Sequence, residues 1–151
     1  MPSLDFLPAT QNDQKPLKEF LLSIFGQSYQ KLLDDYLTSS FSDAFRRPFF
    51  VIGKSGKSIV AAAAISEELF TTNVWGLSWV AVHPENQNKG IGQDLCQFCL
   101  TYISNMAQQD ITAIVLTYPD KTTLYDRLGF TKGSHDHLGG LFMTKKVPYH
   151  G

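Results

Sequence analysis

Short apolar runs bounded by polar turn residues predict the strands of this chain. Such runs, rich in Val, Ile, Ala and aromatic residues, are typical of strands in a sheet. We expect strands over 4–7, 49–52, 58–65, 74–82, 111–117, 130–132 and 141–147. The segment 53–57 contains only Gly, Lys and Ser and lies between two of these runs, which predicts a hairpin turn.

Apolar residues at helical spacing predict the helices. The first helix follows Thr10 and Asp13, which resemble a capping arrangement, and it ends before Gly26. Its apolar stripe consists of Leu17, Phe20, Leu21, Ile24 and Phe25. The second helix stops near 46–48 and carries Tyr29, Leu32, Leu33, Tyr36, Leu37, Phe41, Ala44 and Phe45.

Two further helices are expected in the second half of the chain. The helix from 90 to about 107 carries Ile91, Leu95, Phe98, Cys99, Tyr102 and Met106 on its apolar side. A shorter helix is expected over 121–128, with Gly129 as a left-handed cap and Phe130 packed back on it. This order of elements predicts a mixed α and β fold with helices on both faces of a central sheet.

Composition and charge narrow the class of protein. The chain has 151 residues, 43% of them hydrophobic, so we expect one domain over 1–151. Thirteen basic and fourteen acidic side chains leave a net charge of −1, so nucleic acid is not an expected partner. The apolar runs are far shorter than the roughly 20 residues of a membrane span, and no signal peptide is visible, so no membrane partner is expected. Cys96 and Cys99 are expected to be a reduced, buried pair, which favours a cytoplasmic location.

The segment 79–92 carries the clearest chemistry. An apolar strand stops at Pro84, a polar loop follows, and Gly90 and Gly92 open the next helix. Glycine lets backbone N–H groups approach a ligand closely, and a helix N-terminus favours a phosphate or pyrophosphate. The alternative is an ordinary strand–helix connection whose glycines only allow a tight turn.

Two other phosphate-binding motifs are excluded by counting. The dinucleotide fingerprint requires Gly or Ala three residues after Gly92, where this chain has Leu95. A Walker A loop requires a further glycine ahead of each Gly-Lys-Ser sequence in 53–58, where this chain has Pro48 and Val51.

Several short motifs, in their order and spacing, resemble the GNAT superfamily of N-acetyltransferases. Gln-Asn-Lys-Gly-Ile-Gly over 87–92 resembles the family signature Gln/Arg-x-x-Gly-x-Gly/Ala, and Val-Ala-Val-His-Pro over 80–84 resembles the preceding strand. Leu-Tyr-Asp-Arg-Leu-Gly-Phe over 124–130 is similar to the second family marker, and 8–13 to the family's entry into its first helix. The resemblance covers residues from about 4 to 146.

The resemblance implies a fold and a reaction. The fold would be α/β with a central, mostly antiparallel sheet, helices on both faces, and a splayed parallel pair formed by strands 74–82 and 111–117. The protein would be an N-acetyltransferase that transfers the acetyl group of acetyl-CoA to a primary amine by direct thioester aminolysis, without a metal. The acceptor would be a small-molecule amine or a peptide or protein amine, and a homodimer is left open.

The resemblance also assigns candidate site residues. The cofactor would contact Val80, Ala81, Val82, Gln87, Asn88, Lys89, Gly90, Ile91 and Gly92. Tyr125 lies where the family has its general acid, and a phenol with a reference pKa near 10 can protonate a leaving thiolate. The alternative is that Tyr125 only packs its helix on the sheet.

The sequence leaves the general base open. Many relatives have a glutamate on the strand where this chain reads Gly-Leu-Ser-Trp over 76–79. Glu67 and Glu68 are the nearest acidic candidates, and Glu68 is taken as the candidate base. The alternatives are that the pair is only a solvated surface pair, or that Ser78 or a water relay serves instead. A second departure is Tyr118, where relatives often have an asparagine that helps to hold the pantetheine arm.

Two other groups of residues are candidates for the functional site. His135, Asp136 and His137 lack a clearly placed third ligand, so we expect a loop near the acceptor pocket rather than a metal site. An apolar acceptor site is indicated by Trp75, Trp79, Phe41 and Phe45, although aromatic residues at such spacing commonly form core.

Three functions therefore compete. The first is the N-acetyltransferase. The second is a non-catalytic acyl-CoA-binding module that has kept the loop 87–92 and lost the base. The third is a structural or partner-binding domain whose Gly-x-Gly is only a turn.

Overall fold

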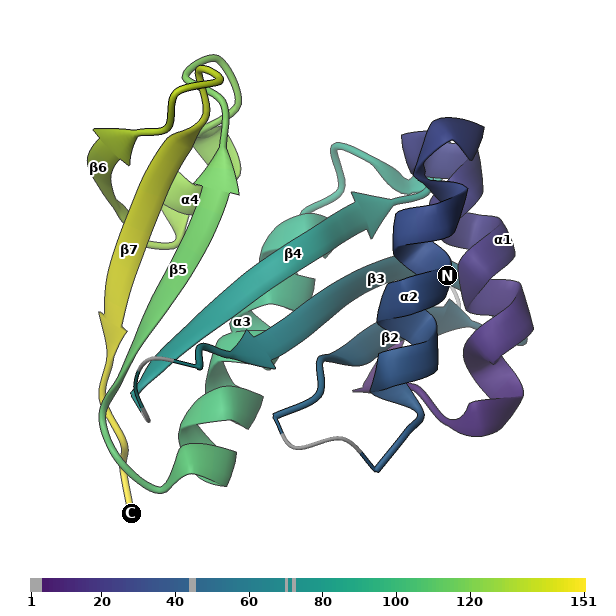
Figure 1. The fold of residues 1–151 in the computed structure, drawn as a ribbon, viewed down its shortest axis with the longest axis horizontal. Helices are drawn as coiled ribbons and strands as arrows, with labels where there is room; N and C mark the ends of the chain where they lie inside the picture. The colour runs from purple at the N-terminus through teal and green to yellow at the C-terminus, as the bar shows by residue number, and fades with distance from the viewer. Residues whose placement is uncertain (1–3, 44–45, 70, 72) are drawn as a thin grey trace.

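A computed structural model describes residues 4–43, 46–69, 71 and 73–151, which form one mixed sheet flanked by helices (Figure 1). The strands are β1 (Asp5–Pro8), β2 (Phe49–Ser55), β3 (Ser58–Glu67), β4 (Val74–Val82), β5 (Ile111–Thr117), β6 (Thr131–His135) and β7 (Leu141–Val147). Their order is β1-β2-β3-β4-β5-β7-β6, and each neighbouring pair is antiparallel except the parallel pair β4 and β5. The predicted fold class is confirmed.

The helices lie on both faces of the sheet, as predicted. They are α1 (Gln14–Phe25), α2 (Gln30–Ser40), α3 (Ile91–Ala107) and α4 (Thr123–Arg127), with short 3-10 turns η1 (Gln11–Asp13), η2 (Gln27–Tyr29) and η3 (Pro84–Asn86). Helices α1 and α2 cover one face of strands β2 to β4, and α3 crosses the other face (Figure 1). None of the described helices is long and apolar enough to cross a membrane.

Strand β3 is buried on both faces and separates two cores. Its alternating side chains face opposite sides of the sheet, so Ala61, Ala63 and Ile65 pack toward α3 while Ala62 and Ala64 pack toward α1 and α2. The α3 side is the larger core and also contains buried residues of β4, β5, α4 and β7. Small side chains in the middle strand let helices approach the sheet from both sides.

The local signals at element ends predict the structure well. Thr10 N–H donates to Asp13 Oδ2 at 2.7 Å, which confirms the capping arrangement before α1. The hairpin turns at Gly56, where φ is +62°, between β2 and β3. Gly129 has φ +88° and caps α4, and Phe130 N–H donates to Tyr125 O at 2.9 Å.

Three details differ from the sequence-based expectation. Helix α2 ends at Ser40, well before the predicted stop, and Ala44 and Phe45 lie outside the described residues. On α3, Met106 is 44% exposed, whereas Leu100 and Ile103 are fully buried. The core-facing side of α3 therefore extends to Leu100 and Ile103 and continues to Ala107, while Met106 lies outside it.

Candidate functional site

The two parallel strands of the sheet part halfway along their length (Figure 1). They pair from Val74 with Thr112 to Leu77 with Val115, and no pairing follows. The register of β4 against β3 shifts between Ala62 and Ala64, opposite Trp79, whose φ is +52°. Such a bulge bends the strand and re-aims its edge. The backbone from Ser78 to Val82 therefore turns away from β5.

This departure leaves an unpaired strand edge at Val82. The N–H of His83 donates to Val60 O at 2.8 Å, so His83 faces β3. Because backbone groups alternate in direction along a strand, the N–H and C=O groups of Val82 face the opened side. The side-chain amide of Gln87 donates to Val82 O at 3.0 Å. Gln87 thus ties the loop to the strand, while the N–H of Val82 remains available to a ligand.

A cavity of about 280 Å³ lies at the N-terminus of α3. Its lining residues are Val82, Asn86, Gln87, Asn88, Gly90, Ile91, Gly92, Gln93, Leu124 and Arg127. The first α-helical hydrogen bond of α3 runs from Asp94 N–H to Gly90 O, so the N–H groups at its start have no partner within the helix. This is the geometry of an anion site at a helix N-terminus.

The two glycines at this cavity have different roles. Gly90 has φ +79°, a left-handed conformation that glycine adopts without strain. Gly92 is helical, and a Cβ added to it would lie 3.6 Å from a methyl group of Val82. Gly90 therefore allows the turn, whereas Gly92, which has no side chain, leaves space in the cavity next to Val82.

Two residues of this region depart from the sequence-based picture. Lys89 is exposed on the loop and is not among the residues that line the cavity. Arg127, from the last turn of α4, does line it and adds a positive charge. Sequence reasoning missed Arg127, although its place two residues after Tyr125 in the second family motif was a usable signal.

Tyr125 lies on α4, on the α3 side of the sheet. Its side chain is buried, and its ring packs against Phe130 with centroids 5.5 Å apart. Burial, and to a lesser extent Cys96, raise the pKa of the Tyr125 phenol above its usual value. Within the described residues its hydroxyl has no hydrogen-bond partner. The hydroxyl is therefore protonated at neutral pH and available as a donor.

Cys96 and Cys99 form the buried, reduced pair that the sequence predicted. Burial raises the pKa of Cys96 to about 12 and that of Cys99 further still. Both side chains are therefore thiols at neutral pH, and a buried thiol is a poor nucleophile. They belong to the core that supports Tyr125.

A second cavity, of about 290 Å³, opens where β4 and β5 part. Its lining residues are Tyr36, Ser66, Glu68, Gly76, Leu77, Ser78, Ile114, Val115, Leu116 and Phe142. Gly76 is paired with both Ser66 and Ile114, and Leu116 with Phe142. Strand alternation places these side chains on the face opposite Trp75, Leu77 and α3.

The structure separates the two glutamates that the sequence placed together. Glu67 Oε1 lies 3.2 Å from Arg46 Nε, in an ion pair. Glu68 lines the second cavity, and a Cβ added to Gly76 would lie 2.9 Å from its Oε1. The space above Gly76 is thus occupied by the Glu68 carboxylate.

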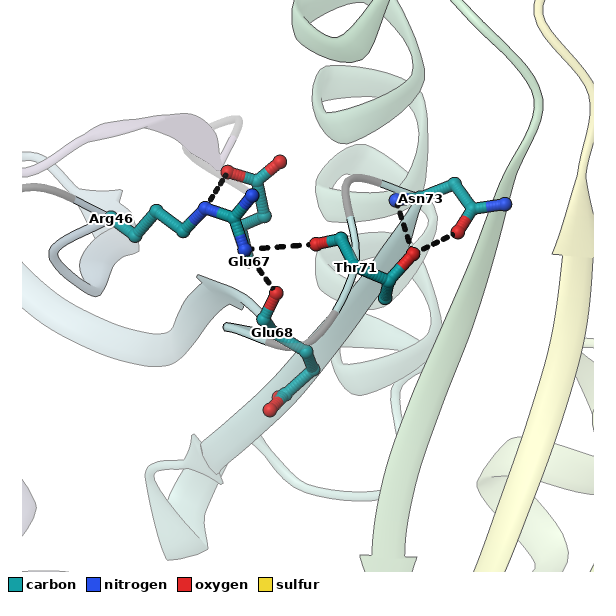
Figure 2. A network of polar contacts seen from close by, with 5 residues as sticks. All are labelled: Arg46, Glu67, Glu68, Thr71 and Asn73. Atoms are coloured by element: carbon teal, nitrogen blue, oxygen red, sulfur yellow. Dashed lines mark hydrogen bonds and ion pairs between the residues drawn. The ribbon is translucent and has the colours of Figure 1, made fainter.

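Arg46 holds the segment that carries Glu68 (Figure 2). Its Nη1 donates to Glu68 O at 2.6 Å and to Thr71 O at 2.9 Å. Thr71 Oγ1 in turn donates to Asn73 Oδ1 at 2.5 Å. One largely buried guanidinium thereby links the chain before β2 to the connection between β3 and β4. Sequence reasoning missed Arg46, because nothing local relates it to residues more than twenty positions away.

The remaining candidates fall outside this arrangement. Trp75 is buried in the α3-side core and is not an acceptor-site wall, whereas Trp79 packs edge-on against Tyr36 beside the second cavity. Tyr118 is 57% exposed, and His135 and His137 are exposed as well. No group of three or more metal-ligating side chains is gathered anywhere in the described part of the chain.

Comparisons with known proteins agree with this geometry. A family model described as an acetyltransferase (GNAT) domain matches residues 46–132. No curated protein sequence matches the chain significantly.

Several solved structures share the fold. The ribosomal-protein-S18-alanine N-acetyltransferase of Escherichia coli has a TM-score of 0.75 at 15% identity, over 99% of this chain and 97% of that one. A GNAT family acetyltransferase of Elizabethkingia anophelis with acetyl-CoA bound has a TM-score of 0.75 at 17% identity, over 97% and 100%. Aminoglycoside 6'-acetyltransferase type Ii has a TM-score of 0.74 at 14% identity, over 95% and 97%.

Proposed function

Because the chain belongs to the GNAT family of acetyltransferases, we propose that it transfers the acetyl group of acetyl-CoA to a primary amine by direct attack on the thioester. One observation carries this proposal. The parting of β4 and β5 lies between an anion cavity at the α3 N-terminus and a separate cavity that contains Glu68.

The residues present fit the cofactor. The free N–H groups at the start of α3, together with Arg127, suit a pyrophosphate. Gly92 leaves room for close backbone approach. Along the strand segment Val80, Ala81 and Val82, the backbone groups that face away from β3, those of Val82 among them, would pair with the amide groups of the pantetheine arm. Acetyl-CoA would supply a thioester, an acyl group activated toward amines.

In the proposed reaction, Glu68 would accept a proton as the general base and Tyr125 would donate one as the general acid. An alkylammonium must lose a proton before it attacks, and the Glu68 carboxylate, directly or through a water, is the proposed acceptor. A backbone N–H of the 80–82 edge would stabilise the oxyanion that forms on the carbonyl oxygen. As the C–S bond breaks, the Tyr125 hydroxyl would give its proton to the departing sulfur. After attack the nitrogen would lose a second proton, which restores the Tyr125 hydroxyl. The net change forms a C–N bond, breaks the C–S bond, places one proton on sulfur and releases the proton taken up by Glu68 to solvent.

The structural neighbours do not fix the acceptor. One of them is named for a ribosomal protein alanine and another for an aminoglycoside, so both protein and small-molecule amines occur among proteins of this fold. The proposed acceptor is accordingly a primary amine.

Free thiol released from acetyl-CoA in the presence of a panel of primary amines tests the function. We expect release that requires both the amine and the protein, with the acetylated amine identified by mass spectrometry. The shift in melting temperature with acetyl-CoA alone tests cofactor binding, because a ligand that binds only the native state must stabilise it. Stabilisation without turnover on any amine would favour a non-catalytic acyl-CoA-binding module, and no stabilisation would leave a structural domain.

A further inference from the structure

The cavity between the parted strands, which contains Glu68, has one charged group and a largely apolar wall. Its apolar side chains come from Ile114, Leu116 and Phe142, whereas Leu77 and Val115, whose side chains belong to the α3-side core, border it with their main chain. Tyr36, Ser66 and Ser78 add hydroxyl groups. Glu68 is the one charged side chain among the described residues that line it.

The main chain at Glu68 is held in place by Arg46, while the charge of the Glu68 carboxylate remains unpaired. The main-chain carbonyl of Glu68 accepts a hydrogen bond from Arg46, but the guanidinium is ion-paired with Glu67 instead. Across the described residues, the carboxylate of Glu68 has neither a hydrogen bond nor an ion pair. It lies against Gly76, where any larger residue would displace it. A carboxylate placed in this way favours a cation delivered by a ligand.

Size and polarity restrict the rest of that ligand. A cavity of about 290 Å³ lies at the lower end of the range of roughly 300–1,000 Å³ for small-molecule sites. A polycation would find no second carboxylate among the described residues of this cavity, and the two carboxylates of the neighbouring cavity, Asp35 and Glu67, are already ion-paired with Lys31 and Arg46. A peptide would bring amide groups against Leu116, Ile114 and Phe142, where they would lose hydrogen bonds to water without replacement.

From these observations we infer that the acceptor is a small primary monoamine with an apolar body, whose ammonium group binds Glu68 and whose body packs against Leu116 and Phe142. This inference rests on the proposed function, because it assigns the acceptor of the same site. It differs from the amines named for the structural neighbours, a protein alanine and an aminoglycoside.

Calorimetric titration of the whole protein with hexylamine tests the inference directly, with and without coenzyme A present. We expect hexylamine to bind at least tenfold more tightly than spermidine, an alanine tripeptide amide, or hexanol, which has the same body without the cation. Glu68→Gln keeps the shape of the side chain and removes its charge. It is expected to weaken hexylamine by about 10- to 100-fold, the scale of a charge-assisted hydrogen bond, and to leave hexanol unchanged.

Matched variants separate loss of the contact between Glu68 and the ammonium group from a general change in charge, cavity shape or folding. Asp5→Asn removes an exposed carboxylate of β1, which lines neither this cavity nor the neighbouring one that shares Glu68, and should not change hexylamine binding. Leu116→Ser shortens a half-exposed cavity wall and should weaken hexylamine and hexanol alike, by about tenfold. Gly76→Ala should weaken hexylamine by displacing the carboxylate. Melting temperatures identify any variant that has lost its fold.

The outcomes distinguish this inference from the proposed function. Equal or tighter binding of spermidine or the tripeptide, no amine binding at all, or unchanged hexylamine affinity in folded Glu68→Gln would each overturn the inference. If acetyl-CoA still binds and another amine class is acetylated, the proposed function stands alone. If acetyl-CoA does not bind but hexylamine binds through Glu68, the proposed function fails and the amine site stands.

Discussion

At the scale of single residues, Tyr125 combines burial with a free hydroxyl. Its ring is fixed against Phe130, and burial raises the pKa of the phenol, so the proton is retained at neutral pH. A general acid requires a proton to give and an orientation in which to give it. Packing and catalysis are therefore compatible roles for this side chain, and a conservative substitution separates them.

Tyr125→Phe should keep the packing and the acetyl-CoA affinity but lower kcat by roughly 10²–10⁴-fold, the usual scale of general acid catalysis. Steady-state thiol release measures the effect. Tyr102→Phe, which removes a hydroxyl from a partly buried tyrosine of α3, serves as the control and should retain normal turnover. Wild-type kcat in a normally melting Tyr125→Phe protein would remove the acid role.

Gly92 offers a test of the anion cavity that leaves the turn intact. Gly92→Ala adds a Cβ with ordinary contacts to Val82, whereas Gly92→Val adds methyl groups that extend into the cavity. We expect the Val variant to weaken acetyl-CoA by about 10- to 100-fold and the Ala variant to have a smaller effect, because close backbone approach is progressively blocked. Calorimetry with acetyl-CoA measures both. Equal affinity across the series would place the cofactor elsewhere.

At the scale of elements, the bulge in β4 and the connection from β3 to β4 build the two sides of the site. The bulge at Trp79 turns the strand edge away from β5. Arg46 binds Glu67, Glu68 O and Thr71 O, and so fixes the main chain at Glu68, beside the second cavity (Figure 2). Arg46 does not line that cavity. It acts through the main chain and is a positioning residue.

Arg46→Met should release this connection while leaving the cofactor cavity intact. We expect a lower melting temperature, a higher KM for the amine and an unchanged affinity for acetyl-CoA, because Glu68 loses its support and Glu67 loses its partner. Arg46→Lys restores the charge but not the fork of donors, and should recover only part of the effect. Arg47→Met, at an exposed neighbour bonded to Ser42 O, is the control. A parallel loss of acetyl-CoA affinity would show a general structural defect instead.

At the scale of the whole molecule, three groups in one core are buried in their neutral forms. Burial raises the pKa values of Cys96, Cys99 and Tyr125, and Cys96 reaches about 12 from a reference value of 9.0. Above pH 9 the unfolded chain releases the two thiol protons, and above pH 10 the phenol proton, while the folded chain retains them. Stability is therefore fully present below the unfolded-state pKa values and falls as the pH rises above them.

Denaturant unfolding from pH 8 to pH 11 checks this expectation. Each buried thiol should lower the free energy of unfolding by about 1.4 kcal/mol per pH unit once the unfolded thiol ionises. The Cys96→Ala and Cys99→Ala double variant is less stable at pH 8 because of the cavities, but its stability should decline less steeply with pH. Identical slopes in the two proteins would mean that the thiols titrate alike in both states.

The local elements of this fold could be predicted from the sequence alone. Strands over 74–82, 111–117 and 141–147 follow from apolar runs, and the turns at Gly56 and Gly129 follow from glycine chemistry. The loop 87–92 and the helix behind it were equally visible, since an anion site at a helix N-terminus is built from consecutive residues. In each case the signal lies within a few positions of the chain.

Only the tertiary structure decided what surrounds those elements. The Glu68 cavity takes its walls from α2, β3, β4, β5 and β7, and Arg46 reaches residues more than twenty positions away. The sequence placed Glu67 and Glu68 together, and packing assigned one to an ion pair and the other to the cavity. The sheet beneath α3 likewise determines which side of this helix is buried, so that Ile103 is buried and Met106 is exposed. Local propensity determines which elements form, whereas the meeting of distant side chains, which no short-range pattern encodes, determines the acceptor side of the site.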